Sequence, residues 1–376
     1  MSDPIMRQPT QRTTFARPTP SAEVYIDELL HLTTRLGASD LHLKAGSPPV
    51  LRIRGDLQVQ AQYEPLSAAD LARLYEQVTN PEQRRRFEQE LELDLSYELE
   101  GVARFRINVA KQRGTITMVM RRLSMIIPTL DDLLLPPVCK ELIMRPRGLI
   151  LVTGPTGIGK STTLAAMIDY LNERQRCRIV TCEDPIEYVF TDKQSMITQR
   201  ELGEDTPSFA SALKHALRQD PDVILVGEMR DLETIAAAIT AAETGHLVLS
   251  TLHTAGAANT VDRIIDVFPP HQQQQVRIQL SMILEGVLSQ TLLPTADGKG
   301  RVVAVEVMVA SPAVRNLIRE AKTHQLPGVI ETSQRLGMRT LDQALIELYR
   351  RGMVTLEDIL AKANNPEHVR QLLRSA

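Results

Sequence analysis

From residue 133 onward, short apolar runs alternate with longer segments of helical periodicity. The apolar runs are four to six residues long and the helical segments ten to fifteen, which is typical of a parallel sheet covered by helices on both faces. The runs that we expect to form strands are Leu149–Thr153, Arg178–Cys182, Val223–Val226, Leu247–Thr251 and Val302–Met308. The pattern predicts an α/β fold in which ligands bind beyond the carboxyl ends of the strands.

Helix boundaries in this part of the chain carry their own signals. Thr206 and Pro207 have the residue types of an N-cap and a first helical position, for a helix that runs to Arg218. Asp231 is suited to begin the next helix and Gly245 to end it.

The residues before 133 follow a different pattern. A helix over Ala22–Leu36, a helical region over Ala68–Gln89 and several short alternating strands predict a small α+β domain. Its strands are expected at Leu41–Leu43, Val50–Ile53, Ala103–Val109 and Thr115–Arg121, the last two forming a hairpin.

These patterns divide the chain into four parts. Residues 1–20 are rich in proline and polar side chains and predict a disordered tail, although their three arginines leave an organelle-targeting peptide as an alternative. The α+β domain covers residues 21–123 and a linker covers 124–131. The α/β domain, with a helical C-terminal region, covers 132–376.

The composition of the chain disfavours several classes of protein. Among 376 residues, 43 Lys and Arg nearly balance 46 Asp and Glu, and the chain has no Trp, so neither a basic field nor stacking platforms favour nucleic-acid binding. Three scattered cysteines, Cys139, Cys177 and Cys182, supply neither a disulfide framework nor two close zinc-binding pairs. No apolar run is long enough to span a membrane, so we expect a soluble, cytoplasmic protein.

The octapeptide at residues 154–161 follows the predicted strand Leu149–Thr153 directly. Its spacing Gly-x-x-Gly-x-Gly-Lys-Ser is that of a phosphate-binding loop, in which glycines allow backbone N–H groups to approach phosphate oxygens. The loop leads into a predicted helix, Lys160–Leu171, whose N-terminus favours anions. The Lys160 ammonium and the Ser161 hydroxyl are suited to the outer phosphates and to Mg²⁺. A nucleoside polyphosphate is the expected ligand, and an ordinary glycine-rich turn is the alternative.

Carboxylates follow two of the predicted strands. Glu183, Asp184 and Glu187 come after Arg178–Cys182, and Glu228 comes after Val223–Val226. Acids at strand ends can order the waters of a phosphate-bound metal or polarise an attacking water. No aspartate precedes Glu228, so the metal must be held by Ser161, water and more distant acids. Solvated loop acids remain the alternative.

Two histidines flank the fourth strand. His246 precedes it, and His253 follows it on the edge where the phosphate loop is expected. A histidine there can respond to the terminal phosphate, whereas a packed histidine is the alternative.

Several of these segments occur in one order along the chain: the phosphate loop, Glu183–Glu187, Gly227–Asp231, Thr244–His246 and Leu252–Thr254. Together they resemble the secretion-superfamily ATPases, and in particular the type IV pilus retraction ATPases of the PilT family. The resemblance extends from Ala38–Leu43 to Gly337–Asp342 and so covers nearly all of the chain after the tail.

The resemblance implies a RecA-like P-loop ATPase domain, a PAS-like N-terminal domain, and ATP with Mg²⁺ as ligands. Lys160 matches the Walker A lysine, Glu187 the acid of the Asp box, Glu228 the Walker B glutamate, and His246 with His253 the His-box pair. The metal is expected at Ser161, Glu187 and Glu228. The expected nucleotide-binding residues are Gly154, Pro155, Thr156, Gly157, Ile158, Gly159, Lys160, Ser161 and Thr162.

The same resemblance implies a homo-hexamer in which nucleotide lies between the two kinds of domain. N-terminal arginines complete such a site, and the candidates on matching strands are Arg104, Arg106, Arg113 and Arg121. We select Arg104 and Arg121, since a guanidinium near the γ-phosphate neutralises charge in the transition state. The alternative for each is a solvated strand arginine.

The resemblance also implies that the protein drives retraction of a pilus and not its assembly. The extension and secretion branches of the superfamily carry a zinc-binding tetracysteine insert, which three cysteines cannot supply. Residues 311–320 resemble the C-terminal AIRNLIRE segment of the retraction branch, with Val314 in place of an isoleucine. Ile158, Cys182 and Arg339 depart from the family pattern without removing a reacting group.

We therefore expect a cytoplasmic ATP-hydrolysing hexamer, at the inner-membrane base of a pilus machine, that powers pilus retraction and twitching motility. Expected partners are an inner-membrane platform protein and related pilus ATPases, with no nucleic acid and contact with the membrane only through partners. The alternative is an accessory or regulatory nucleotide-binding hexamer of a pilus or type II secretion system that scarcely hydrolyses ATP. A RecA-like nucleic-acid translocase is a third possibility, which the balanced charge disfavours.

Overall fold

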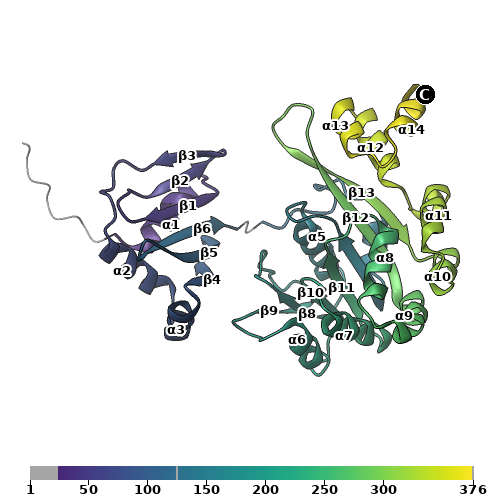
Figure 1. The fold of residues 1–376 in the computed structure, drawn as a ribbon, viewed down its shortest axis with the longest axis horizontal. Helices are drawn as coiled ribbons and strands as arrows, with labels where there is room; N and C mark the ends of the chain where they lie inside the picture. The colour runs from purple at the N-terminus through teal and green to yellow at the C-terminus, as the bar shows by residue number, and fades with distance from the viewer. Residues whose placement is uncertain (1–23, 124–125, 375–376) are drawn as a thin grey trace, which may run out of the picture. The chain divides into compact units, whose positions relative to one another are not determined.

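The computed structural model describes residues 24–123 and 126–374, which form two compact units (Figure 1). Unit 1 covers Met1–Leu123 and unit 2 covers Ser124–Ala376. The predicted tail at 1–20 lies outside the described residues, as do residues 124–125 of the predicted linker. Among the described helices, none is long and apolar enough to cross a membrane.

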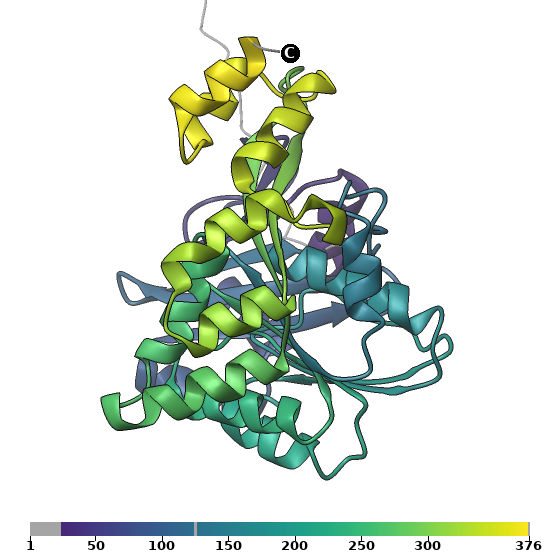
Figure 2. The same cartoon turned by 90° about the vertical axis from the view of Figure 1, so that its right-hand side faces the viewer.

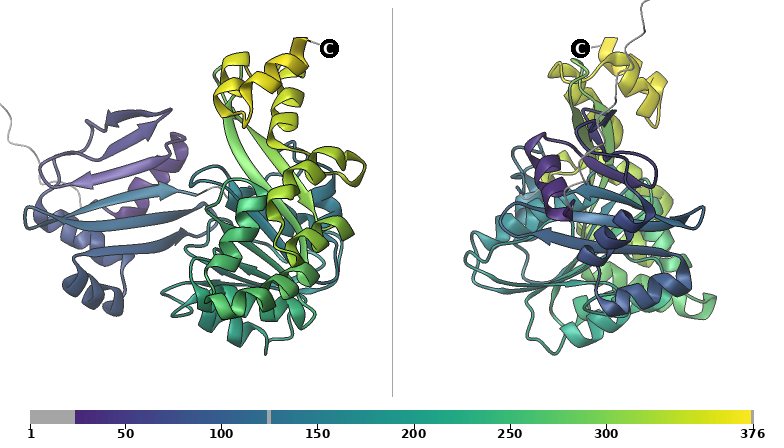
Figure 3. Two further views of the ribbon diagram at one scale, coloured as in Figure 1. Left: turned by 45° about the vertical axis from the view of Figure 1, so that its right-hand side comes forward. Right: turned by 90° about the vertical axis from the view of Figure 1, so that its left-hand side faces the viewer.

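Unit 1 is built on a six-stranded antiparallel sheet with the order β3-β2-β1-β6-β5-β4 (Figure 3). Alternate side chains of its strands are buried, so that Phe105 and Ile107 lie in the core while Arg104 and Arg106 lie on the opposite face. The strands are β1 (Asp40–Lys44), β2 (Val50–Ile53), β3 (Asp56–Val59), β4 (Glu92–Leu99), β5 (Ala103–Gln112) and β6 (Thr115–Arg122). The predicted hairpin is β5–β6 and is confirmed.

Three helices complete the core of unit 1: α1 (Ile26–Arg35), α2 (Ala68–Val78) and α3 (Pro81–Glu90). The region that we predicted as one helical stretch, 68–89, is two helices. Asn80 caps α3 by accepting hydrogen bonds from Glu82 N and Gln83 N, and Pro81 occupies the first helical position. Because proline cannot donate a backbone hydrogen bond to the preceding turn, α2 ends before it.

Unit 2 is built on a seven-stranded sheet with the order β13-β12-β7-β11-β10-β8-β9, parallel except for β13. The α/β fold class is confirmed. The strands are β7 (Gly148–Thr153), β8 (Arg178–Glu183), β9 (Met196–Glu201), β10 (Val223–Val226), β11 (Leu247–Leu252), β12 (Leu284–Pro294) and β13 (Arg301–Val309).

Both faces of this sheet are buried. In β7, Leu149 and Leu151 belong to one hydrophobic cluster, while Ile150 and Val152 belong to another on the opposite face. The helices that cover the two faces are α4 (Val138–Ile143), α5 (Lys160–Asn172), α6 (Phe209–Ala216), α7 (Leu232–Glu243), α8 (Ala257–Asp266), α9 (Pro270–Ile283), α10 (Pro312–Arg319) and α11 (Leu326–Thr332). Figure 2 shows α10 and α11, in yellow-green, in front of the sheet.

The remaining helices pack beside the far end of the β12–β13 hairpin (Figure 1). They are α12 (Leu341–Arg350), α13 (Leu356–Lys362) and α14 (Pro366–Arg374), and two short 3₁₀ turns, η1 (Thr323–Gln325) and η2 (Gln334–Leu336), precede them. Leu293 and Val302 of the hairpin pack with Leu345 of α12 in a separate hydrophobic cluster.

Two boundaries in unit 2 differ from the expectation. Helix α6 begins at Phe209, and its N-cap is Ser208, whose side chain accepts a hydrogen bond from Ser211 N. Thr206 was therefore the wrong N-cap. The N-cap of α7 is Asp231, as predicted, since its side chain accepts from Thr234 N.

Candidate active site

The loop over residues 154–159 joins β7 to α5 at the carboxyl edge of the sheet. Gly154, Gly157 and Gly159 have φ angles of 131°, 81° and 90°, which disfavour residues with a Cβ. A Cβ on Gly157 or Gly159 would point into open space, and a Cβ on Gly154 would collide with Ile158 and lie 2.6 Å from Gln290 O. The loop therefore leaves its backbone at Gly157 and Gly159 open to a ligand, and phosphate as that ligand stays a prediction.

Lys160, the first residue of α5, spans this loop. The residue is 8% exposed, and its ammonium donates hydrogen bonds to Gly154 O at 2.8 Å and Pro155 O at 3.1 Å. Burial lowers the pKa of Lys160, although the charges of Glu228 and Glu187 oppose that shift. Helix α5 has no side-chain cap at Gly159, so its first N–H groups face the loop without a competing cap.

Glu228 follows β10 and is fixed by two partners. Arg230 Nε lies 2.6 Å from Glu228 Oε1, and His253 Nε2 lies 3.1 Å from Glu228 Oε2. The other ring nitrogen of His253 lies 3.3 Å from Thr156 Oγ1 in the phosphate loop. The structure therefore brings the loop, Glu228 and His253 together at one edge of the sheet.

Glu187 lies in the segment between β8 and β9. Its charge acts on Lys160 together with that of Glu228, which places all three groups in one electrostatic environment. The next residue, Tyr188, has its hydroxyl 3.1 Å from Thr162 Oγ1 in the first turn of α5. The acidic segment is thereby linked to the helix that begins with Lys160.

Mg²⁺ fits this arrangement. Among the described residues, no cluster of three or more His, Cys, Asp or Glu side chains is preformed for a metal. Mg²⁺ keeps several waters and uses few protein ligands when it binds with phosphates, so one hydroxyl and nearby carboxylates suffice. Ser161 in the first turn of α5, with Glu187 and Glu228 beyond the strands, offers these groups.

His246 is separated from the other candidates. It precedes β11, whose six residues span roughly 20 Å and end next to His253. Its ring Nδ1 lies 2.9 Å from Ala241 O and 3.1 Å from Thr244 Oγ1, so it closes the C-terminus of α7. Within one chain the structure does not bring His246 to the phosphate loop.

Arg104 and Arg121 belong to unit 1, on the sheet face opposite its core. Arg121 Nε donates to Asp40 Oδ1 at 2.9 Å, and Arg104 Nη1 lies 3.6 Å from Glu98. Burial raises the pKa of Asp40, but hydrogen bonds from Ser39 and Arg121 outweigh it and lower that pKa overall. Arg121 Cα is in register with Arg106 on the neighbouring strand, which adds to the positive charge of this face.

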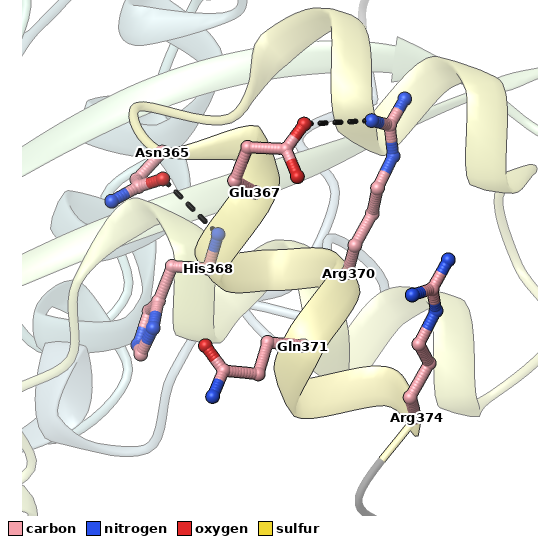
Figure 4. Close-up of a pocket in the computed structure, with 6 residues that line it drawn as sticks. All are labelled: Asn365, Glu367, His368, Arg370, Gln371 and Arg374. Carbon is pink, nitrogen blue, oxygen red and sulfur yellow. Dashed lines mark hydrogen bonds and ion pairs between the residues drawn. The ribbon is translucent and has the colours of Figure 1, made fainter.

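Two cavities in unit 2 lie apart from the phosphate loop. One, of about 580 Å³, is lined by the N-terminal residues and outer face of α14, where Asn365 accepts from His368 N and Glu367 pairs with Arg370 (Figure 4). Another, of about 710 Å³, lies between the start of α8 and α11–α12. None of the predicted site residues lines either cavity, and so neither replaces the loop as the candidate site.

Sequence reasoning missed the partners that hold these groups. Arg230 is two residues after Glu228, and its charge was the available signal. Thr156 was predicted only as a phosphate-loop residue, but it also contacts His253. The role of Tyr188 could not be read from spacing, because its partner Thr162 is 26 residues away.

Comparison with known proteins decides the family. The family model described as type II/IV secretion system protein matches residues 19–361. The chain belongs to this family. Among related secretion proteins, the type IV pilus retraction ATPase PilT of Pseudomonas aeruginosa is 50% identical over 343 residues, which cover 91% of this chain and 99% of that protein. A twitching motility protein of Neisseria gonorrhoeae is 51% identical over 319 residues and 85% of each chain.

Solved structures of this family agree. The crystal structure of the pilus retraction motor PilT with bound ADP has a TM-score of 0.87 and 48% identity, and the match covers 93% of this chain and all of that one. The ATPase DotB of Legionella pneumophila has a TM-score of 0.75 and 29% identity over 92% of this chain. The predicted resemblance and the RecA-like fold are thereby confirmed, whereas a PAS-like identity for unit 1 stays a prediction.

Proposed function

We propose that this type II/IV secretion system protein is an ATP-hydrolysing motor that powers retraction of a type IV pilus and so twitching motility. The observation that carries the proposal is the contact of Glu228 with His253, which in turn contacts the phosphate loop at Thr156. Similarity to a pilus retraction ATPase over 99% of that protein's length supports the assignment to retraction.

Each residue of the site has a proposed role. Residues 154–162 bind the phosphates, and the Lys160 ammonium moves from the loop carbonyls to the β and γ oxygens. Glu228 orients the attacking water, while His253, hydrogen-bonded to Glu228, responds to the γ-phosphate. Glu187 assists through the water shell of the metal. Mg²⁺, held by Ser161 with Glu187 and Glu228, would neutralise phosphate charge when bound.

The assembly is proposed on the resemblance. A homo-hexamer brings arginines such as Arg104 and Arg121 to nucleotide, in which position they neutralise transition-state charge. An inner-membrane platform protein and related pilus ATPases are the proposed partners, at the cytoplasmic base of the pilus machine. Nucleic acid is not proposed as a partner, because 43 basic and 46 acidic residues leave no basic excess.

Replacing Glu228 with Gln tests the enzyme assignment. The variant is expected to bind ADP with Mg²⁺ as the wild type does and to lose steady-state phosphate release by about 10²-fold or more, because Gln cannot accept a proton from water. Wild-type turnover in the variant would remove Glu228 from its role. Negligible turnover in the wild-type hexamer would favour an accessory nucleotide-binding protein instead.

Deleting the gene tests the assignment to retraction. Cells without the protein are expected to keep surface pili that do not retract and to accumulate them in excess. Loss of surface pili would point to an assembly motor and contradict the proposal.

A further inference from the structure

The segment that carries Glu187 is held by one side chain of the neighbouring edge strand. Gln199, on β9, donates from Nε2 to Tyr188 O at 2.8 Å and accepts at Oε1 from Phe190 N at 2.8 Å. One primary amide therefore satisfies a carbonyl and an N–H of the backbone that follows Glu187. Only a side chain with both a donor and an acceptor makes this pair of bonds, and in this chain Gln199 fills that position.

The other side of Glu187 is held by the same strand. Glu201, two residues after Gln199 and so on the same face of β9, accepts from Ile186 N at 3.2 Å. Gln199 also donates to Glu183 Oε1 at 3.1 Å, at the end of β8. The backbone on both sides of Glu187 is thus hydrogen-bonded to side chains of β9.

The anchored segment reaches α5 through Tyr188. Its hydroxyl lies 3.1 Å from Thr162 Oγ1, next to Ser161 in the chain. Gln199 therefore acts on a segment that contacts the phosphate-binding helix directly, and displacement of this segment would move Glu187 relative to Lys160.

We propose that Gln199 is a positioning residue for hydrolysis, which acts by holding Glu187 at the phosphate loop. This rests on the proposed function, since it assumes that Glu187 takes part in ATP hydrolysis. Gln199 itself touches neither nucleotide nor metal in this proposal. Its loss should lower turnover without lowering the affinity for nucleotide, because residues 154–162 remain intact.

The test replaces Gln199 with Met, which keeps the length of the side chain and removes its three hydrogen bonds. A displacement of about 1 Å at a reacting group can cost about 10²-fold, so we expect kcat for phosphate release to fall at least 10-fold. The Kd for ADP with Mg²⁺, measured by fluorescence anisotropy of a labelled analogue, should stay within about 3-fold of the wild-type value. An unchanged kcat, or a loss of affinity in proportion to kcat, would overturn the proposal.

Gln194→Met is the matched control. Gln194 is exposed, precedes β9 and donates to Glu173 O at 2.7 Å, away from the acidic segment. The Gln194→Met variant should therefore have the kcat of the wild-type protein. If any Gln→Met change beside β9 lowered kcat non-specifically, the control would lose kcat as well.

A double-mutant cycle separates positioning from a structural role. If Gln199 acts through Glu187, then Gln199→Met should add almost no loss of kcat in a Glu187→Gln background. An equal loss in both backgrounds would show that Gln199 acts elsewhere, and would sink the proposal.

Hydrogen exchange gives a readout that does not need hydrolysis. The Phe190 N–H bonds to Gln199, so its exchange in Gln199→Met should be about 10-fold faster or more. If the wild-type protein released no phosphate, the proposed function would fail, while the exchange rate would still decide whether Gln199 anchors the segment. Unchanged exchange at Phe190 would show that it does not.

Discussion

Glu183, at the end of β8, offers the sharpest test of the electrostatics of this site. Burial raises the pKa of Glu183 from 4.5 to about 7, and the charges of Glu187 and Glu201 add to that shift. Hydrogen bonds from Thr181 Oγ1 at 2.6 Å and Gln199 Nε2 at 3.1 Å reduce it. The folded protein therefore binds this proton more tightly than the unfolded chain does.

This difference in pKa between the folded and unfolded states determines whether the unfolding free energy rises or falls with pH. Below about pH 4.5 the group is protonated in both states, and its contribution to stability is fully present. As the pH rises toward 7, the unfolded chain releases the proton first, and the contribution is lost. The separation between 4.5 and about 7 corresponds to at most about 3 kcal/mol of unfolding free energy.

Replacing Glu183 with Gln removes this titration and keeps the oxygen that accepts from Thr181 and Gln199. At pH 8 the variant should therefore be more stable than the wild type, by up to about 3 kcal/mol. In a unit of this size that difference would raise Tm by roughly 6 to 12 °C. At pH 5 the difference should be much smaller, because the carboxyl group is then protonated in the folded protein and the unfolded chain has only begun to lose the same proton.

The assay is thermal unfolding of nucleotide-free protein at pH 5, 6, 7 and 8. Glu233→Gln is the control, since Glu233 is an exposed carboxylate in the first turn of α7. Its Tm difference from the wild type should not follow the same pH curve. The reasoning would be refuted if Glu183→Gln and the wild type differed by the same amount at pH 5 and pH 8, or if the variant were the less stable protein at pH 8.

Three further substitutions test particular contacts. Gly154→Ala places a Cβ 2.6 Å from Gln290 O at a φ of 131°. The Kd for ADP, measured by fluorescence anisotropy, should therefore rise at least about 10-fold. An unchanged Kd would contradict the loop geometry. Arg315→Lys removes a guanidinium that donates to three backbone carbonyls and to Glu285. A denaturant titration should therefore show a free energy of unfolding lower by about 2 kcal/mol. Wild-type stability in the variant would mean that those bonds are dispensable. Asp40→Asn leaves Arg121 without its counter-charge in unit 1, and we expect a loss of about 1 to 3 kcal/mol in the same titration, with no loss as the contrary result.

The phosphate loop could be predicted from the sequence because its structure is local. Gly154, Gly157 and Gly159 need positive φ angles whatever surrounds them, and the strand before and helix after them have clear signals of their own. Glu228 and His253 could also be placed, because both follow parallel strands and therefore share the edge with the loop.

Other features depend on contacts that spacing does not reveal. Strand β12 was missed because Leu284 follows Ile283, the last residue of α9, with no turn between them, and because Ser289, Gln290 and Thr291 interrupt its apolar residues. Gln199 looks like any polar residue of an edge strand until the register with β8 sets it opposite Thr181. The two histidines were paired on the resemblance alone, although a six-residue strand holds them apart.

Within residues 24–123 and 126–374, the hydrophobic clusters of unit 1 have no residue in common with those of unit 2. Phe105 belongs to a cluster of unit 1 and Leu151 to a cluster of unit 2, so a change at either position alters the stability of its own unit. Substitutions in the core of residues 24–123 should therefore leave the hydrophobic packing around the phosphate loop unchanged. Among relatives of this protein, we expect the core residues of one unit to vary independently of the core residues of the other.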